Sequence, residues 1–324
     1  HRADHLGVAF TRPFVDTPVI DALARRGLLF VDCQSTTNVT NPSHIAVMTG
    51  IHPRDTQITN NTTMVAEQVT TLAESFQAAG YRTFAAISTQ HLGPSQSGLG
   101  QGFDRFESTD EFKRRGEEAV AQIERWIEES RGEPVFAWVH LFDAHSPYQP
   151  PERVASKYYD GDPRDTSRTL AVGSAHVPGW VQGQGITDVD YVSALYKGEV
   201  DTMDSSLRDL LETPRVRNGI VAFTSDHGES LGTKGIWWDH AGLYLPNLQV
   251  PCVIAAPGVA AGRCEEPVQQ IDLGRTLLDL AGIEGAFPGR NLVDVALDPP
   301  GDEPRFSISS HGLQAAVSSG DWFL

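Results

Sequence analysis

Residues 218–229 decide the fold, and they read Asn218-Gly219-Ile220-Val221-Ala222-Phe223-Thr224-Ser225-Asp226-His227-Gly228-Glu229. The run from Ile220 to Phe223 is short, apolar and partly β-branched, which predicts a strand buried on both faces of an α/β sheet. Ligands of such sheets bind beyond the carboxyl ends of the strands, where loops converge. An aspartate and a histidine at that end, before a glycine that lets the backbone turn, fit a divalent metal site. The alternative is that Asp226 caps a helix and His227 is a surface residue.

Strands and helices alternate along the rest of the chain. Apolar runs predict further strands at 28–31, 83–87, 135–141 and 250–255. Apolar residues at helical spacing predict helices at 18–26, 42–48, 72–79, 111–130, 191–211 and 273–280. This alternation predicts an α/β fold with a mostly parallel sheet between layers of helices. The Pro-, Gly- and Asp-rich stretch at 147–187 predicts a long excursion of the kind that often carries substrate recognition.

The charge balance restricts the classes of partner. The 324 residues include 25 Lys and Arg against 42 Asp and Glu, which gives a formal net charge of −17. No clustered Lys/Arg surface of the kind that nucleic acid requires is present in the sequence, and no stretch is long and apolar enough for a membrane span. An acidic protein that takes an anionic substrate must concentrate positive charge inside its site, most economically as a metal ion. The cellular compartment stays open.

A second segment, Val39-Thr40-Asn41-Pro42-Ser43-His44, places a hydroxyl just before a predicted helix. With Pro42 at the first helical position, the backbone N–H groups and the positive helix end would point toward the Thr40 hydroxyl. Such a terminus binds anions. A phosphoryl or sulfuryl group could be held there while a metal lowers the pKa of the Thr40 hydroxyl. The alternative is that Thr40 or Asn41 only caps the helix.

Two further polar segments follow predicted strands or lie in the loops after them. In His140-Leu141-Phe142-Asp143-Ala144-His145, His145 is a candidate general acid or donor to a substrate oxygen, whereas His140 lies in the apolar run and is expected in the core. In the loop at 232–240, Lys234 offers a fixed cation and His240 a titratable donor for a trianionic transition state. Either could instead be a solvated loop residue.

These segments together resemble the sulfatase family of the alkaline phosphatase superfamily. Members commonly show Arg-x-Asp-x-Leu-Gly, then Thr-Pro-x-Ile-Asp-x-Leu-Ala-x-x-Gly, then a nucleophile-x-Pro-Ser-Arg/His helix closed by Thr-Gly. The order and spacing match at Arg2 to Gly7, Thr17 to Gly27, and Thr40 to His44 ahead of Thr49-Gly50. The resemblance continues through His140 to Tyr148, Ser225 to Leu231, Asp239 to Tyr244 and Val250-Pro251.

The resemblance implies a metal-dependent hydrolase that cleaves sulfate, phosphate or phosphonate esters through a Thr40 nucleophile and a covalent intermediate. Asp226 and His227, together with Thr40, would ligate a divalent ion. Ca, Mg, Mn and Zn are all compatible with that role, and the histidine ligand favours Mn or Zn. The implied substrate is an ester of a small molecule, a glycan or a lipid.

The remaining site residues take supporting roles by the same resemblance. His44 stands where many members have an arginine that steadies the nucleophile. His145 and His240 look like the basic residues that contact the transferred group and the leaving oxygen. Lys234 would neutralise charge. Thr56 and Lys234 occupy positions where relatives often carry histidine, which weakens any transfer of detailed roles.

The chain departs from the family at its nucleophile and at its ends. Sulfatases with formylglycine make it from Cys or Ser, which Thr40 cannot replace, so the chain looks more like the phosphodiesterase and phosphotransferase branches. The family's paired Asp ligands precede the Arg2 segment. We therefore expect a fragment cut at both ends, with a catalytic domain at 1–295 that lacks its first strand and an ion completed by Asp ligands upstream of residue 1. Residues 296–324 would begin a small antiparallel C-terminal subdomain, truncated here.

Two alternatives to a hydrolase stay open. One is a phosphotransferase of the same superfamily, which passes the group to an acceptor other than water. The other is a noncatalytic relative that binds anionic glycans or lipid headgroups with the same pocket.

Overall fold

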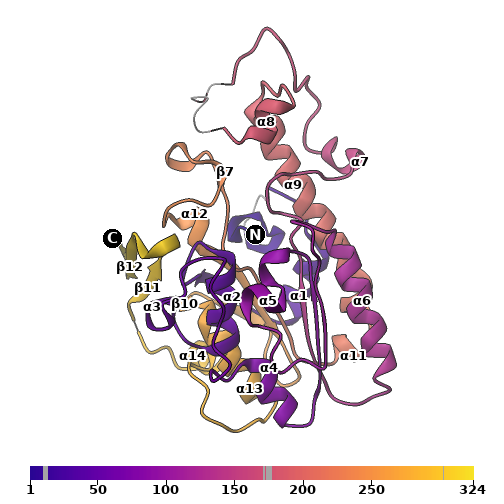
Figure 1. Ribbon diagram of the computed structural model, residues 1–324, viewed down its shortest axis with the longest axis vertical. Coiled ribbons are helices and arrows are strands. Elements are labelled where there is room, and N and C mark those ends of the chain that lie inside the picture. Colours follow the sequence, from indigo (N-terminus) through magenta and orange to yellow (C-terminus); the bar gives the residue numbers. More distant parts are fainter. Residues whose placement is uncertain (10–13, 171, 173–176, 302) are drawn as a thin grey trace.

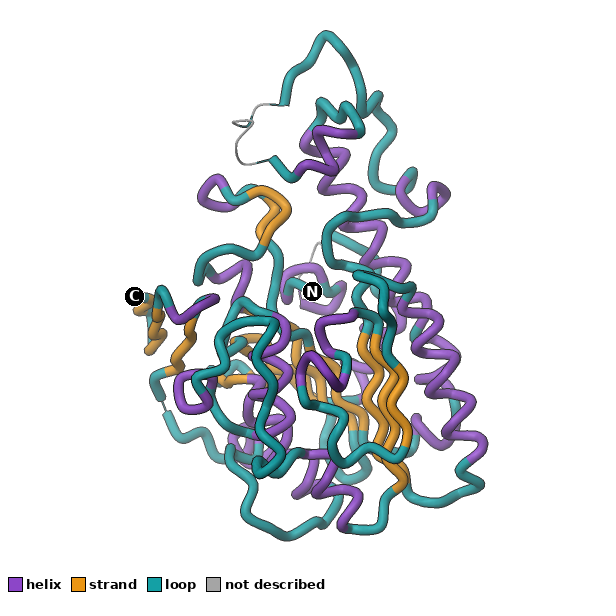
Figure 2. The backbone as a smooth tube through the Cα atoms, viewed as in Figure 1, coloured by secondary structure: helices purple, strands orange, loops and turns teal. Residues whose placement is uncertain are grey.

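Helices cover both sides of two central sheets in the computed structural model, which describes residues 1–9, 14–170, 172, 177–301 and 303–324 (Figures 1 and 2). The first sheet has the order β10-β1-β8-β5, and β9 also pairs with β1. Its strands are β1 (Leu28–Gln34), β5 (Val221–Thr224), β8 (Gln249–Ala255), β9 (Gly262–Cys264) and β10 (Val268–Gln269). The second sheet has the order β3-β2-β4, formed by β2 (Arg82–Ile87), β3 (Arg105–Glu107) and β4 (Val135–His140).

Strand direction makes the architecture a mixed sheet. β2 runs parallel to both β3 and β4, and β1 runs parallel to β9 and β10. β8 runs antiparallel to both β1 and β5. Because β1 and β5 both oppose β8, they run in the same direction and their carboxyl ends lie at the same edge of the sheet. The predicted α/β fold class is confirmed, with β8 as its antiparallel strand.

The prediction that β5 is buried on both faces is wrong. Ala222 is exposed, and Val221 and Phe223 are only partly buried. The reason is that β5 pairs with β8 alone among the described residues, so its other edge has no strand beside it. An apolar run in the sequence indicates that burial would be favourable. Full burial of a strand also requires neighbouring strands on both of its edges.

Alternate residues of β2 face the two helix layers. Phe84 and Ala86 pack in one apolar cluster, and Ala85 and Ile87 pack in another on the opposite face. The first layer consists of α1 (Pro18–Arg26), α6 (Gly116–Glu129), α9 (Val189–Ser206) and α10 (Arg208–Glu212). The second consists of α2 (Thr40–Thr49), α4 (Leu72–Ala78) and α13 (Leu273–Leu280). The period of two in a strand therefore accounts for the three-layer arrangement.

Several predicted helix boundaries shift. The helix expected at 111–130 begins at Gly116, because the buried carboxylate of Asp143 accepts hydrogen bonds from the Gly116 N–H at 3.1 and 3.3 Å. Residues 111–115 form a loop instead. The helix expected at 191–211 divides into α9 and α10 near Leu207.

The start of α1 is capped by a residue from another helix. The Thr17 side chain makes no capping bond there, since it accepts from the Gly7 N–H and donates to Asp21. Asp204 of α9 is buried, and its carboxylate accepts from the N–H groups of Val19 and Ile20 at 3.1 and 2.8 Å. This contact joins α1 to α9 through two backbone donors that would otherwise lack partners.

A small antiparallel sheet lies at the edge of the molecule that carries the C-terminus (Figure 1). It contains β11 (Arg305–Ile308), β12 (Ala315–Ser319) and β13 (Trp322–Phe323). Arg305 pairs with both carboxylate oxygens of Asp32 at 2.7 and 2.9 Å, and Ile308 forms a parallel bridge with Thr37. The antiparallel C-terminal sheet is confirmed, whereas the domain boundary after residue 295 stays a prediction.

The excursion at 147–187 stands above the sheets together with the hairpin of β6 (Ser230–Leu231) and β7 (Trp237–Asp239) (Figure 1). The short helices α7 (Glu152–Ala155) and α8 (Gly179–Gly183) belong to this excursion. The other short helices are α3 (Pro53–Thr56), α5 (Pro94–Ser97), α11 (Pro214–Arg217), α12 (Leu245–Leu248) and α14 (Leu292–Leu297). A search of the described residues found no helix with the length and hydropathy of a membrane span.

Replacing Asp204 with Ala should lower the free energy of unfolding by about 2 kcal/mol, because two buried N–H groups at the start of α1 lose their acceptor. Asp209 on α10 is exposed and makes no side-chain hydrogen bond, so Asp209→Ala is the matched control and should change stability by less than about 0.5 kcal/mol. Urea unfolding measures both values. Equal losses in the two variants would contradict the capping role.

Candidate active site

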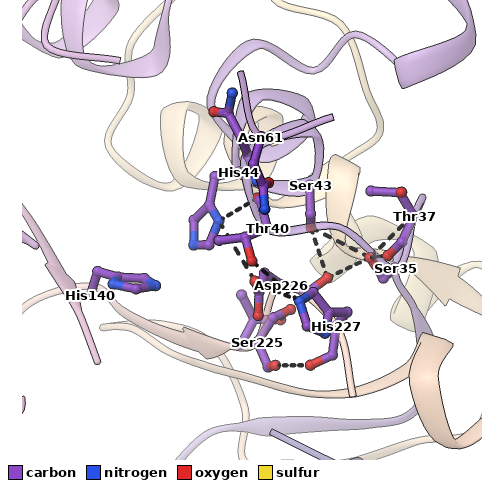
Figure 3. A network of polar contacts seen from close by, with 12 residues as sticks. Ser35, Thr37, Thr40, Ser43, His44, Asn61, His140, Ser225, Asp226 and His227 are labelled. Carbon is purple, nitrogen blue, oxygen red and sulfur yellow. Dashed lines mark hydrogen bonds and ion pairs between the residues drawn. The ribbon is translucent and has the colours of Figure 1, made fainter. Parts of the chain in front are cut away.

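The loop after β5 is fixed to the loop after β1 through the backbone carbonyl of Asp226 (Figure 3). Ser43 donates to this oxygen at 2.7 Å and Gln270 Nε2 at 3.0 Å, and the Ser35 hydroxyl lies at 2.5 Å. Ser35 has one hydroxyl proton, so it donates either to Asp226 or to the Thr37 carbonyl, which is 2.6 Å away. Three regions distant in sequence, at residues 35–43, 226 and 270, therefore meet at one carbonyl group. Ser35, Ser43 and Gln270 were not among the predicted site residues.

Thr40 begins α2 and faces the loop after β5. Thr40 is 1% exposed, and its Oγ1 lies 3.4 Å from Nε2 of His227. The helix starts two residues earlier than predicted, so Pro42 is the third residue rather than the first. The Asn41 N–H donates to the side chain of Asn61, which removes that N–H from any anion site. Thr40 is thus held in the first turn rather than in front of it.

Asp226 lies between two imidazoles. Its Oδ2 is 3.3 Å from His227 Nε2 and 4.0 Å from His44 Nδ1. Burial alone would raise the pKa of Asp226, but the neighbouring His227 and His44 outweigh burial, so its pKa lies below the ordinary value. Burial lowers the pKa of His227 to about 3 despite the attraction of Asp226, and it also lowers the pKa of His44. The site therefore combines a carboxylate with neutral imidazoles at pH 7.

The hydrogen bonds to backbone carbonyls assign the tautomers of four histidines. Carbonyl oxygens only accept, so the ring nitrogen facing each one carries the proton. The Nδ1 atoms donate as follows: His44 to Thr40 at 2.8 Å, His145 to Ser146 at 2.5 Å, His227 to Gly228 at 2.8 Å and His240 to Asn38 at 2.8 Å. Each neutral ring is left with a lone pair on Nε2. Such a backbone contact is also what orients a histidine that ligates a metal.

His240 and His145 extend the cluster toward the excursion. The ring centroids of His227 and His240 are 4.2 Å apart, and those of His240 and His145 are 5.7 Å apart. The ring of His145 stacks on Phe142 at 4.2 Å. Burial lowers the pKa of His145 to about 3, with a further contribution from His240. The structure thus brings His145, His240 and His227 into one row.

The remaining predicted residues lie at the margin of this row. His140 is buried at the end of β4, as expected for a core histidine, and its ring lies 5.0 Å from that of His44. Lys234 is exposed on the turn Thr233–Gly235, and within the described part of the chain no hydrogen bond or ion pair joins it to another site residue. Its expected charge-neutralising role stays a prediction.

The donors near Thr40 fit part of a cation shell. Asp226 Oδ2 and the Nε2 lone pair of His227 face each other at 3.3 Å with no proton between them, a contact that a cation would turn from repulsive to attractive. The Thr40 hydroxyl is a third donor on the same side. Among the residues that the structure describes, no group of three or more His, Cys, Asp and Glu side chains could hold an ion alone. The protein atoms described thus supply two ligands and a hydroxyl.

A buried ion pair that the sequence did not reveal holds the His145 loop. Lys113 Nζ donates to the carbonyls of Asp143 at 2.6 Å and His145 at 3.0 Å, and it contacts Glu199 Oε1 at 3.1 Å. Glu199 of α9 is fully buried and also accepts from the Gln149 N–H at 2.7 Å. Lys113 falls within the helix predicted at 111–130, whereas it lies in the loop before α6, so the predicted helix gave no signal for this contact.

Comparison with known proteins identifies a family that matches most of the chain. The family model described as "Sulfatase" matches residues 2–283. A choline-sulfatase of Rhizobium meliloti is 22% identical, in an alignment that covers 95% of this chain and 73% of that protein. An uncharacterized sulfatase of Escherichia coli and an ulvan-active sulfatase of Formosa agariphila are 24% and 25% identical, and the chain spans 66% and 63% of their lengths.

Solved structures agree with the fold. A phosphonate monoester hydrolase from Silicibacter pomeroyi has a TM-score of 0.79 at 19% identity, covering 100% of this chain and 84% of that one. The protein BT4656, solved with D-glucosamine-2-N,6-O-disulfate, has a TM-score of 0.77 at 16% identity and coverage of 100% and 86%. At these identities the likeness concerns the fold alone.

The buried pair of Lys113 and Glu199 should show strong coupling in a double-mutant cycle. Lys113→Met and Glu199→Gln should each lower the free energy of unfolding by about 3 kcal/mol, because each removes the nearest opposite charge from a buried partner. Arg115 stays 3.8 Å from Glu199 in both Lys113 backgrounds. The double variant should lose at least about 1 kcal/mol less than the sum. The exposed pair Arg263 and Glu265 is the control, and its coupling should stay below about 0.5 kcal/mol. Additive losses in the Lys113 and Glu199 variants would show that the two side chains do not act as a coupled ion pair.

The imidazole of His145 should not titrate between pH 5 and pH 8, because burial holds its pKa at about 3 and its Nδ1 proton is bound to the Ser146 carbonyl. Two-dimensional NMR of the imidazole nitrogens, with a short histidine peptide as reference, measures this. His145→Gln identifies its signals by their loss. A midpoint near pH 6.5 for the assigned ring would show that the side chain is not buried in this way.

Proposed function

The chain belongs to the sulfatase family, and from that membership we propose that it is a metal-dependent hydrolase of sulfate, phosphate or phosphonate esters with Thr40 as its nucleophile. The observation that carries the proposal is the meeting of the Thr40 hydroxyl with the Asp226-His227 pair, 187 residues away in sequence. Among its relatives, one is named for choline sulfate and one for phosphonate monoesters. These names support the proposed reaction class, and the contact between Thr40 and His227 supports Thr40 as the nucleophile.

Asp226, His227 and Thr40 are the residues that would hold the cation. When bound, a divalent ion would lower the pKa of the Thr40 hydroxyl and balance the charge of the transferred group. The imidazole ligand favours Mn or Zn over Ca or Mg. Asp226 is fixed through its carbonyl and His227 through its Nδ1–H, so neither side chain has to reorganise to bind an ion.

The chain's own residues would move protons as follows. The Thr40 oxygen forms a bond to sulfur or phosphorus while the bond to the leaving alcohol breaks. His145 or His240 would protonate the alcohol. Nε2 of His145 is unprotonated, because burial holds the pKa of His145 at about 3 and its Nδ1 carries the ring proton, so His145 must take up a proton first. The proton that Thr40 loses is a sufficient source. Water then attacks the Thr40 ester and restores the hydroxyl.

An anionic group is excluded from this row unless a cation is present. The Nε2 lone pairs of His145 and His227 repel sulfate and phosphate oxygens, and the chain carries a net charge of −17. Neither His145 nor His227 is protonated near pH 7. The exposed Lys234 lies outside the row. The proposal therefore makes anion binding depend on the ion held by Asp226 and His227.

Thr40→Ala should lower ester hydrolysis by at least about a thousandfold, because the covalent intermediate can no longer form. Thr40→Ser keeps a hydroxyl and should retain measurable turnover. Thr37 is equally buried and its hydroxyl has no partner, so Thr37→Val is the control and should keep wild-type rates. The measurement uses sulfate, phosphate-diester and phosphonate esters of one chromogenic alcohol, after chelation and return of Mn2+ or Zn2+.

The outcomes separate the alternatives. Unchanged turnover by Thr40→Ala would remove the residue from the mechanism. Binding of the esters without any turnover by the wild-type protein would favour a noncatalytic binding protein. Transfer of the group to an added alcohol in preference to water would favour a transferase.

A further inference from the structure

A cavity of about 490 Å³ opens beside the row of histidines. His145 and His240 stand in its wall, so it adjoins the side of the row that lies away from Thr40 and His44. The excursion and the loop at 232–241 supply most of the rest of the wall, and Ser146 and Glu229 complete it. Its remaining lining residues are Ser146, Val177, Pro178, Glu229, Gly235, Ile236, Trp237, Trp238, Asp239 and Ala241.

The wall is acidic and aromatic. Glu229 and Asp239 are its charged residues, and Trp237 and Trp238 give it two indole rings. No lysine or arginine stands among the described lining residues. Carboxylates and indole faces both attract cations, and together they repel an anionic ligand.

Two polar atoms of this wall lack partners. Glu229 is 4% exposed, and its Oε1 accepts no hydrogen bond from any described residue. Trp238 is 1% exposed, and its Nε1–H has no acceptor there. Buried polar groups without partners are uncommon in folded proteins, and a ligand that carries an N–H group could supply the donor that Glu229 Oε1 lacks.

The aromatic side of the cavity is rigid before any ligand arrives. Gly232 has a φ of 111°, and a Cβ atom there would lie 2.6 Å from the ring of Trp237. The ring therefore rests directly on the backbone of Gly232. Only glycine permits this contact, because it has no Cβ and adopts a positive φ freely. A ring held in this way loses little freedom when a ligand binds against it.

We propose that this cavity binds the alcohol part of the substrate and that this alcohol carries an ammonium group. The assignment rests on the proposed function, since His145 and His240 would face both the transferred group and the alcohol. An ammonium N–H would donate to Glu229 Oε1, and the indoles of Trp237 and Trp238 would contact its carbon atoms. The substrate is then a small cationic ester rather than a polyanionic glycan.

Binding of inert ligands tests the cavity without any turnover. Propylammonium should bind at least about tenfold more tightly than 1-propanol or propionate in calorimetry, which corresponds to about 1.4 kcal/mol. Glu229→Gln should bring the three affinities within about twofold of each other, and Trp237→Leu should weaken propylammonium binding. Glu284 is exposed and lies outside the cavity wall, so Glu284→Gln is the charge-matched control and should keep the preference. Equal affinities in the wild-type protein would overturn the proposal.

Matched esters then test the cavity as part of the active site. The sulfate or phosphonate esters of ethanolamine, 1-propanol and glycolic acid are similar in size and differ in the charge of the alcohol. The ratio of kcat/KM for the cationic and neutral esters should exceed about ten and should fall toward one in Glu229→Gln. Turnover of all three esters at equal efficiency would overturn the cavity assignment while the proposed function stands. Binding of propylammonium without turnover of any ester would overturn the proposed function, whereas the cation preference of the cavity would stand.

Discussion

The carbonyl group of Asp226 is the contact on which the candidate site depends. Ser43 from α2 and Gln270 from the segment before α13 donate to it, and Ser35 after β1 lies within reach. These side chains fix the turn after β5 against the start of α2, which brings the Asp226 carboxylate and the Thr40 hydroxyl to the same side. A single buried carbonyl that met no donors there would cost several kcal/mol, so the turn has a strong reason to stay closed. The sheet brings the carboxyl ends of β1 and β5 to one edge. The hydrogen bonds at the Asp226 carbonyl then set the positions of Thr40 and Asp226 relative to each other.

Such a cluster defines what a sequence can and cannot predict. Apolar runs predicted β1, β2, β4, β5 and β8, since burial of alternate residues in two layers shapes the chain locally. The reversed direction of β8 was beyond reach, because a strand buried on both faces reads the same in either direction. The start of α6 was missed for a related reason. The acceptor for its first N–H is Asp143, 27 residues away, and Lys113 was taken for part of the helix when it is buried against Glu199.

The four histidines could be predicted from their motifs, but their tautomers could not. Each Nδ1–H donates to a backbone carbonyl, and only coordinates show which carbonyl is in reach. The consequence is electrostatic. Rings that present Nε2 lone pairs, as those of His145 and His227 do at pH 7, resemble ligands for a cation more than a pocket for an anion, and the chain's acidity strengthens that character. Positive charge confined to one ion would let an acidic protein hold a sulfate or phosphate group at a single point and repel anions elsewhere.

The two sides of the histidine row are formed by different parts of the fold, which differ in how freely their sequence can vary. The side of Thr40 and Asp226 is built at strand ends and on the first turn of a helix, where packing in the sheet leaves little freedom. The other side is built from the excursion and the 232–241 loop, which pack with α9 in an apolar cluster of their own and can change without disturbing the sheet. A fold divided in this way can keep one group-transfer chemistry while its loops decide which alcohol is accepted. Glu229 links the two sides, because it follows His227 by two residues and still lines the cavity, so the acidity of the alcohol pocket is tied to the same turn that positions the nucleophile's neighbours.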